Sequence, residues 1–268
     1  MIRALAVCVA LALGWPVAFH AADLPAWVRE LTSRRPAGSF SPPPPSMHLV
    51  YRFGWVNLPA AKADVHFRTD EPGRYETNAT GGTFGLPRTL FRLDVVHRST
   101  TDRATLHPLR LFQEERYKAQ TVRTSVDYTP SGLTALREVT PAKEPAEPRT
   151  FSLTPVFDIQ SALLWLRSTP LEPGQRETLI VWPSNAPYLA TATVAGRERI
   201  RVNGEEKAAI RIDLQLQRID KNLGLQEHRK FKAGRGWLSD DDLRLPLRFE
   251  ADLFIGFVYA ELESAQPE

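Results

Sequence analysis

The sequence predicts a mainly β protein: a single antiparallel sheet, strongly curled or closed into a barrel, with one short internal helix at about 158–168. Three observations predict this class. From Met47 onward most segments alternate apolar and polar residues, the period of a half-buried strand. The dipeptide Asn203-Gly204 separates two such segments, which is typical of a tight hairpin. One later segment changes to a helical period, so a helix interrupts the strands.

Residues 1–22 are expected to be a cleavable export signal. Arg3 supplies a positive start, and the apolar run 4–14 is shorter than the roughly 20 residues that span a bilayer. A retained anchor is the alternative. Cys8 is the sole cysteine and lies in this run, so the exported chain would have no thiol for a disulfide, a metal site or a nucleophile. We therefore expect a periplasmic protein without a transmembrane segment after cleavage.

Residues 23–46 predict a short helix followed by a proline-rich linker. Trp27, Val28 and Leu31 fall on one side of the helical segment, and four prolines follow at 42–45. Consecutive prolines favour a stiff extended spacer. Recognition by a proline-binding partner is the alternative interpretation.

Residues 47–263 are expected to form one β-rich domain, and residues 264–268 a tail. The first two strands should each place their apolar side chains on a single face, because successive strand residues point to opposite sides. These alternating sets are Leu49, Tyr51, Phe53 and Trp55, then Ala61, Ala63, Val65 and Phe67. Further strands are expected at 74–79, 91–98, 109–117 and 121–128. Residues 140–150 are the nearest candidate for a linker between domains, and a long hairpin loop explains them equally well.

The hairpin at 197–219 is the strongest local signal. Asn203 and Gly204 both tolerate the positive φ that a type I′ turn requires, so we assign them a structural role. Apolar residues at 210, 212, 214 and 216 then alternate with polar ones.

The helix at 158–168 has clear start and stop signals. Asp158 is the expected N-cap, Arg167 lies near the negative end of the helix dipole, and Pro170 ends the segment. Asp158 is therefore predicted to be structural.

Three stretches carry a family resemblance. "LVYRFGWVNLPAAKADVHF", "DIQSALLWLRSTPLEPGQ" and "GWLSDDDLRLPLRFEADLFIGFVYAEL" resemble an exported bacterial family catalogued as domain of unknown function 3108, over roughly residues 47–262. The matching features are a helix from Asp158 to Arg167, the turn Pro173-Gly174 and the strand that leads from Trp237 to an Asp turn. Ala60-Ala61 departs from the pattern, where a glycine is expected. The resemblance implies an envelope location and a β-rich fold, but no activity.

Composition and motifs exclude several functional classes. The net charge is +3, from 34 basic and 31 acidic residues that are interspersed, so no nucleic-acid surface is expected. The histidines lack metal-ligand spacing, and neither a G-x-S-x-G elbow nor a phosphate loop occurs. We predict no catalytic residues, no metal site and no cofactor.

The run Asp240-Asp241-Asp242 is ambiguous. It could offer oxygens to a divalent cation, but it lacks the spacing of a calcium loop. A turn between two strands explains it better, because Asp side chains accept hydrogen bonds from nearby backbone amides. Asp240 is the residue that we expect to meet a partly buried arginine.

The aromatic residues suit either a dense core or an apolar cavity inside a barrel, since barrels of modest strand number can enclose a small ligand. Arginines on strand faces could add an anion contact there, or could form a solvated face with cross-strand pairs, as parity predicts for Arg244 and Arg248. The candidate ligand-binding residues are Trp55, Trp165, Arg167, Trp237, Asp240 and Arg244.

The leading hypothesis is non-catalytic binding of an apolar or amphiphilic envelope molecule, lipid-like or otherwise, or of an envelope protein. One alternative is an envelope hydrolase with convergent carboxylates from Asp158, Asp240 and their neighbours. Another is an interaction module that uses the proline segment or an exposed strand edge.

Overall fold

The computed structural model describes residues 24–32, 40, 42–56, 58–142, 144–227, 233–253 and 256–268. The expected export signal at 1–22, with Cys8, lies outside these residues.

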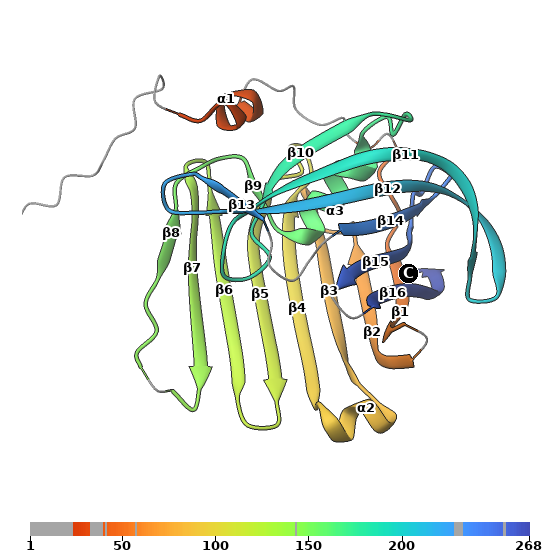
Figure 1. Cartoon of the computed structure of the whole chain (residues 1–268), viewed down its shortest axis with the longest axis horizontal. Coiled ribbons are helices and arrows are strands. Elements are labelled where there is room, and N and C mark those ends of the chain that lie inside the picture. The colour runs from red at the N-terminus through yellow and green to blue at the C-terminus, as the bar shows by residue number, and fades with distance from the viewer. Residues whose placement is uncertain are drawn as a thin grey trace, which may run out of the picture.

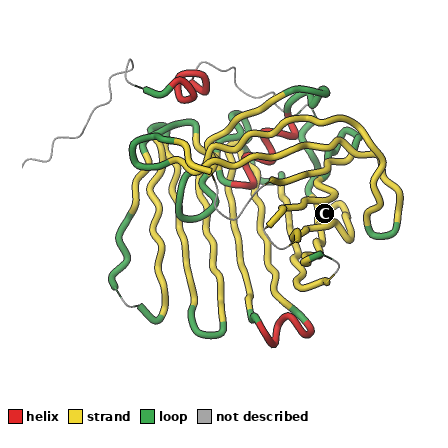
Figure 2. The backbone as a smooth tube through the Cα atoms, viewed as in Figure 1, coloured by secondary structure: helices red, strands yellow, loops and turns green. Residues whose placement is uncertain are grey.

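One large sheet dominates the chain (Figures 1 and 2). Its strand order is β8-β7-β6-β5-β4-β3-β2-β1-β16-β15-β14-β12-β11-β10-β9, with β13 paired to β12. The first half comprises β1 (Met47–Trp55), β2 (Leu58–Arg68), β3 (Arg74–Thr83), β4 (Leu93–Asp102), β5 (Pro108–Tyr117), β6 (Thr121–Thr129), β7 (Gly132–Thr140) and β8 (Arg149–Phe151). The second comprises β9 (Val156–Phe157), β10 (Arg176–Val181), β11 (Tyr188–Val202), β12 (Glu205–Ile219), β13 (Leu225–Glu227), β14 (Ala233–Ser239), β15 (Pro246–Leu253) and β16 (Gly256–Pro267).

The sheet curls strongly but does not close. Its two edge strands, β8 and β9, are consecutive in the chain, and no ladder joins them among the described residues. The connection from Phe151 to Val156 can span at most ~18 Å, so the edges must lie near each other. The prediction of a strongly curled sheet is confirmed, and the alternative of a barrel closed by hydrogen bonds is wrong. The edge strands have three and two residues, and Pro155 between them has no N–H, so few backbone groups could pair.

The prediction of a purely antiparallel sheet also fails at this edge. β9 pairs with β10 in parallel, whereas the other strand pairs are antiparallel within the described chain. The parallel pair arises because α3 (Ile159–Ser168) connects the end of β9 to β10, which is the crossover that parallel neighbours require.

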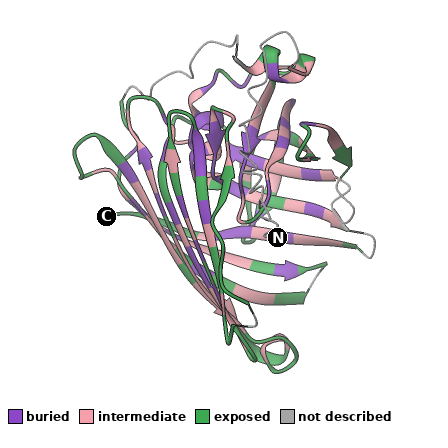
Figure 3. Ribbon diagram, turned by 90° about the vertical axis from the view of Figure 1, so that its left-hand side faces the viewer, coloured by how far each residue is buried: buried purple, intermediate pink, exposed green. Residues whose placement is uncertain are grey.

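The core lies between the two halves of the curled sheet. Long strands β4–β7 form one wall, and β10–β12 cross above it in Figure 1. One apolar cluster joins Leu111 and Val126 of the first half to Ile180 and Leu189 of the second. Buried residues alternate with more exposed ones along the strands in Figure 3, as the period of two predicts.

Helix α1 (Ala26–Thr32) belongs to this core. Val28 is buried in the same cluster, and the Trp27 indole donates a hydrogen bond to the Leu223 carbonyl at 3.1 Å. The short helix predicted in 23–46 therefore exists, but it packs on the domain. The proline segment does so as well, because Pro44 is buried.

The β11–β12 hairpin has the predicted turn, with φ of 48° at Asn203 and 83° at Gly204. Its tip returns to the sheet: the Asn203 backbone N–H donates to the Glu261 carboxylate at 3.3 Å, and its side-chain amide donates to the Glu263 carbonyl at 3.0 Å. The hairpin thereby covers part of β16.

Two local expectations differ from the structure. Residues 264–267 continue β16, with Pro267 opposite Met47, so they are not a tail. Residues 85–90 form the short helix α2 (Gly85–Leu90), where no helix was expected between the strands predicted at 74–79 and 91–98. Gly85 has φ of 56°, which lets the chain leave β3 and enter this helix. Among the described residues, no helix is long and apolar enough to cross a membrane.

Candidate functional site

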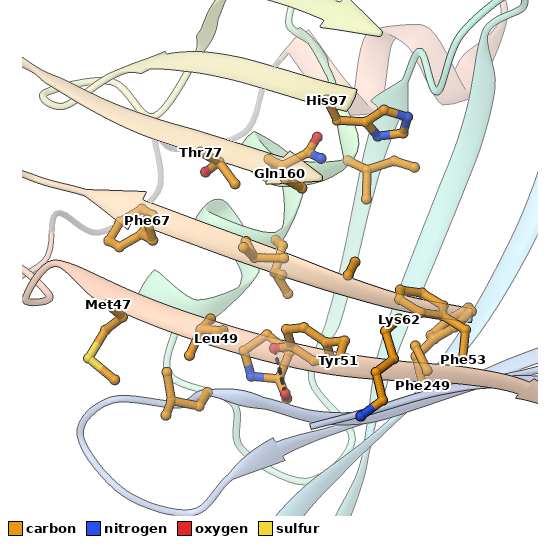
Figure 4. A pocket seen from close by; sticks show the side chains of 18 of the residues that line it. Met47, Leu49, Tyr51, Phe53, Lys62, Phe67, Thr77, His97, Gln160 and Phe249 are labelled. Atoms are coloured by element: carbon orange, nitrogen blue, oxygen red, sulfur yellow. Dashed lines mark hydrogen bonds between the residues drawn. The ribbon is translucent and has the colours of Figure 1, made fainter. Parts of the chain in front are cut away.

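A cavity of about 630 Å³ lies between helix α3 and the concave face of β1–β4 (Figure 4). Residues of β1, β2 and α3 supply half of its wall, and β3, β4, β15, β16 and the loop residues Pro44, Pro45, Leu243 and Leu245 supply the rest. From β1 and β2 these are Met47, Leu49, Tyr51, Phe53, Ala61, Ala63, Val65 and Phe67; from α3 they are Ile159, Gln160, Leu163, Leu164 and Arg167.

Small side chains explain why this part of the sheet is hollow. Ala61, Ala63 and Ala79 lie on neighbouring strands at the centre of the wall, and Ala260 adds a fourth small residue from β16. Larger residues surround them on the same face. Because packed interiors leave few voids larger than a water molecule, a hollow of this size lined by alanine is a specific feature of the sequence.

The cavity opens toward one end of the strands. Phe53, Ala260 and Phe249 are cross-strand neighbours that line it, and Phe53 and Phe249 remain more than one-third exposed. Ile159 at the start of α3 also lines the cavity and is exposed. An apolar molecule could therefore enter from solvent along aromatic side chains.

Asp158 fixes the start of α3 as predicted. Its carboxylate accepts from the Ser161 backbone N–H at 2.7 Å, and the Ser161 hydroxyl accepts from the Asp158 N–H at 3.1 Å, which completes a capping box. The Ser99 hydroxyl of β4 donates to the other carboxylate oxygen at 2.6 Å. Burial raises the pKa of Asp158, although these donors oppose the shift. The helix is thus fastened to the sheet beside the cavity.

Arg167 carries a buried cation in the cavity wall. Its side chain donates to the Leu243 carbonyl at 2.7 Å and lies over the Phe40 ring at 5.8 Å. Desolvation lowers its pKa to about 10, so it stays protonated at neutral pH. Its Nε has no hydrogen-bond partner, and within the described chain no carboxylate lies within ion-pair distance of it, although the charge of Asp241 acts on it from farther away. A charge held in this way favours an anion nearby.

Two titratable side chains in the wall, Tyr51 and His97, are neutral. The Tyr51 hydroxyl donates to the Pro246 carbonyl at 2.8 Å, and burial raises the pKa of Tyr51 (Figure 4). Burial lowers the pKa of His97, and its Nε2 has no partner among the described residues. Lys62 also lines the cavity, but its ammonium pairs with Glu263 at 2.7 Å. Arg167 is therefore the cation of this wall that lacks an ion-pair partner in the described chain.

Of the six predicted ligand-binding residues, Arg167 lines the cavity, and the other five do not. Trp165 is buried against Phe157 at 5.2 Å between ring centroids, in the core beside α3. The Trp237 indole donates to Glu198 at 2.7 Å. Their contacts give both tryptophans a packing role.

Trp55, Asp240 and Arg244 lie at the ends of strands. Trp55 ends β1 and is 45% exposed. Asp240 pairs with the exposed Arg197 at 3.3 Å, and not with the buried arginine that we expected. The Arg244 guanidinium donates to the carbonyls of Arg167 and Thr169, so it caps the C-terminal end of α3.

The three aspartates form a turn, and Asp241 organises it. Its Oδ1 accepts from the Ser239 hydroxyl at 2.7 Å and from the backbone N–H groups of Leu243 and Arg244, both at 3.0 Å. Arg244 adopts φ of 45° there, so it precedes β15 and does not share a face with Arg248. Within the described residues, no three His, Cys, Asp or Glu side chains are grouped so that they could hold a metal ion.

Sequence reasoning missed several wall residues. Thr77, Ala79 and His97 carry no motif, and their parity alone could have placed them on the face of Leu49 and Tyr51. The hollow itself gives a faint signal, which is the recurrence of alanine at alternate positions of one strand.

The chain has recognisable relatives. The family model described as "Protein of unknown function (DUF3108)" matches residues 48–263, which confirms the resemblance seen in the sequence. No curated protein matches the chain.

The solved structures add information on the fold. A β-barrel-like protein of the DUF1849 domain family from Brucella abortus superposes with a TM-score of 0.55 at 8% identity, covering 84% of this chain and 98% of its own. A protein described as exported, with a YmcC-like fold, from Bacteroides fragilis gives a TM-score of 0.32 at 8% identity, covering 86% and 97%. The first of these shows that a similar β-barrel-like fold occurs in a protein of another domain family.

Proposed function

The chain belongs to the DUF3108 family, and from that premise and the cavity geometry we propose that it binds an apolar or amphiphilic molecule of the cell envelope without catalysis. The bound molecule would lie between α3 and the concave face of β1–β4.

The cavity is the observation that carries this proposal. Its volume of about 630 Å³ falls within the range of small-molecule sites, which are mostly apolar with a few oriented polar groups. Here the apolar surface comes from alanine, leucine and phenylalanine side chains. Transfer of apolar area from water into such a wall supplies the binding free energy, at about 25 cal/mol per Å² buried.

Arg167 supports an amphiphile with an acidic group. A buried guanidinium without an ion-pair partner in the described chain gains most from an anion that reaches the same cavity. The apolar wall would then hold the chain of the ligand, and Arg167 would hold its acidic end.

The expected export signal at 1–22 supports an envelope location. We propose the periplasm as the compartment in which the ligand is met.

The alternatives have less support. Asp158 is fully buried under α3, whereas Asp240 pairs with Arg197 at an exposed turn, so these two carboxylates do not share an open cleft. Pro44 and Pro45 line the cavity and belong to the wall, which leaves less of the proline segment for a separate partner.

The test fills the cavity. In Ala79→Phe a ring would occupy the space beside Val65 and His97, while Ala208→Phe places the same ring on an exposed strand position outside the cavity. Binding is measured by fluorescence of N-phenyl-1-naphthylamine and its displacement by a long-chain fatty acid. Native mass spectrometry of protein purified from its own envelope identifies the natural ligand.

We expect Ala79→Phe to weaken probe binding at least tenfold and Ala208→Phe to bind as the wild type does. Thermal unfolding of each variant checks that the fold is retained. Unchanged probe binding in a folded Ala79→Phe variant would contradict the proposal, as would a wild type that neither binds the probe nor carries a copurifying molecule.

A further inference from the structure

Exposed apolar side chains gather at one end of the sheet, where the cavity opens. They belong to the β1–β2 turn and to α2 with its flanking residues. We call this set the apolar rim: Trp55, Val56, Leu58, Phe84, Leu86, Leu90 and Phe91. Leu90 is 83% exposed and Leu86 is 70% exposed. Soluble proteins usually scatter such residues singly, so a cluster of this kind marks an interaction surface.

The two parts of the rim are neighbours. The backbone N–H of Phe84 donates to the Ala60 carbonyl at 3.1 Å, and α2 contacts β2. Figure 1 shows α2 beside the lower ends of β2 and β3. The Thr83 hydroxyl donates to the Phe91 carbonyl at 3.0 Å, which holds the end of α2 against β3.

The rim is continuous with the cavity wall. Phe53 precedes the β1–β2 turn by a few residues and lines the cavity, and Thr83 and Leu93 bracket α2 and line it as well. The apolar rim and the wall of the cavity therefore meet at Phe53 and Leu93.

Charge around the rim favours an anionic surface. Segments 55–60 and 84–92 contain no Asp or Glu but include Arg88 and Arg92. Asp94 pairs with Arg88 at 2.7 Å and lies 3.5 Å from Arg92, which orients both guanidinium groups beside the rim. Aromatic and aliphatic side chains next to arginine are the composition of segments that lie at a bilayer interface.

We propose that the apolar rim docks on the surface of a lipid bilayer and that the cavity ligand passes across it; this inference rests on the proposed function. The rim projects from the β1–β2 turn and from the short helix α2, and a fluid lipid layer can surround such separate projections, whereas a rigid protein partner would need a matching surface. Docking would let an apolar molecule move between bilayer and cavity without crossing water. Passage through water would cost free energy in proportion to the apolar area of the molecule that is exposed.

The experiment is flotation of the purified protein with vesicles of phosphatidylethanolamine, with and without phosphatidylglycerol. The double variant Leu86→Asp/Leu90→Asp adds charge at the two most exposed rim positions. Leu109→Asp is the matched control. Leu109 is 43% exposed and lies at the start of β5, which is the end of that strand away from the apolar rim. Probe binding to the cavity is measured in parallel without vesicles.

We expect the wild type and Leu109→Asp to float with vesicles, more so with phosphatidylglycerol, and the double variant to bind at least tenfold more weakly. Probe binding should be unchanged in all three proteins. Flotation of the double variant equal to the wild type would overturn the inference, as would absence of wild-type flotation, or a wild-type dimer that the double variant dissociates. Loss of probe binding in the wild type itself would instead contradict the proposed function.

Discussion

Replacement of Asp158 tests how helix α3 is held against the sheet. The carboxylate has two separate tasks: one oxygen accepts from the Ser161 N–H at the helix start, and the other accepts from the Ser99 hydroxyl of β4. Asp158→Ala removes both acceptors. Asp158→Asn keeps the first, and the Ser99 hydroxyl can rotate to accept from the new amide.

The loss of stability expected for Asp158→Ala follows from these contacts. Loss of an N-cap costs about 0.5–2 kcal/mol. Ser99 is 3% exposed, so its hydroxyl without a partner adds about 1–3 kcal/mol. We expect Asp158→Ala to lower the free energy of unfolding by about 2–4 kcal/mol, which corresponds to a fall in Tm on the order of 5–15 °C. At about pH 4, Asp158→Asn should lie within about 1 kcal/mol of the wild type.

The pH dependence gives a second, independent measurement. Because burial raises the pKa of Asp158 in the folded state, folded protein retains a proton that the unfolded chain has released. The stability contributed by this group is complete below the unfolded value near 4 and is lost as pH rises through the folded pKa. The difference in stability between the wild type and Asp158→Asn should therefore fall with rising pH above about 4, by up to ~1.4 kcal/mol per pH unit.

Urea unfolding of the wild type, Asp158→Ala, Asp158→Asn and Ser99→Ala across pH 4–8 measures these effects. Two results would refute the reasoning. An Asp158→Ala variant as stable as the wild type would mean that the cap and the Ser99 contact contribute nothing. A parallel pH profile for the wild type and Asp158→Asn would mean that Asp158 ionises alike in both states.

Two other predictions concern Arg167 and the aspartate turn. Arg167→Met should weaken binding of a long-chain fatty acid about tenfold or more, because a charge-assisted hydrogen bond contributes about 1.5–3 kcal/mol. Binding of the matching fatty alcohol should be unaffected. Equal losses of affinity for both ligands in the displacement assay would assign Arg167 a packing role. Asp241→Asn should change the free energy of unfolding by no more than about 0.5 kcal/mol, whereas Asp241→Ala should lower it by about 1–3 kcal/mol. The reason is that three donors converge on one oxygen, which Asn retains. Equal denaturation midpoints for these two variants would contradict the turn mechanism.

Local chemistry made much of the fold predictable. The helix that starts at Asp158 and the turn at Asn203-Gly204 both follow from backbone requirements of single residues, and the structure has both. Alternation placed Leu49, Tyr51 and Phe53 on one face, which is the face that lines the cavity. These features depend on neighbours in sequence, so the sequence contains their signal.

The site was less predictable because it depends on contacts between distant segments. Trp165 and Trp237 were attractive as ligand contacts by size alone, yet both pack inside the core. The hollow results from alanines on strands that come together only after the sheet curls, and no residue type by itself marks a void. Arg167 lies in the last turn of α3, as the helix signals predict, and it also lines the cavity; its role as a ligand contact stays a prediction.

The missing ladder between β8 and β9 bears on how the cavity can respond to its contents. In a closed barrel, strand number and stagger set the diameter, so expansion would break backbone hydrogen bonds. Here the circumference is interrupted at one seam, where a four-residue connection and side-chain packing join the edges. The sheet can change its curvature at that seam while every strand keeps its hydrogen-bonded neighbours. A longer or bulkier ligand would thus be accommodated by rearranged side-chain packing at the seam, which can change in small steps. The cooperative network of backbone hydrogen bonds would stay intact.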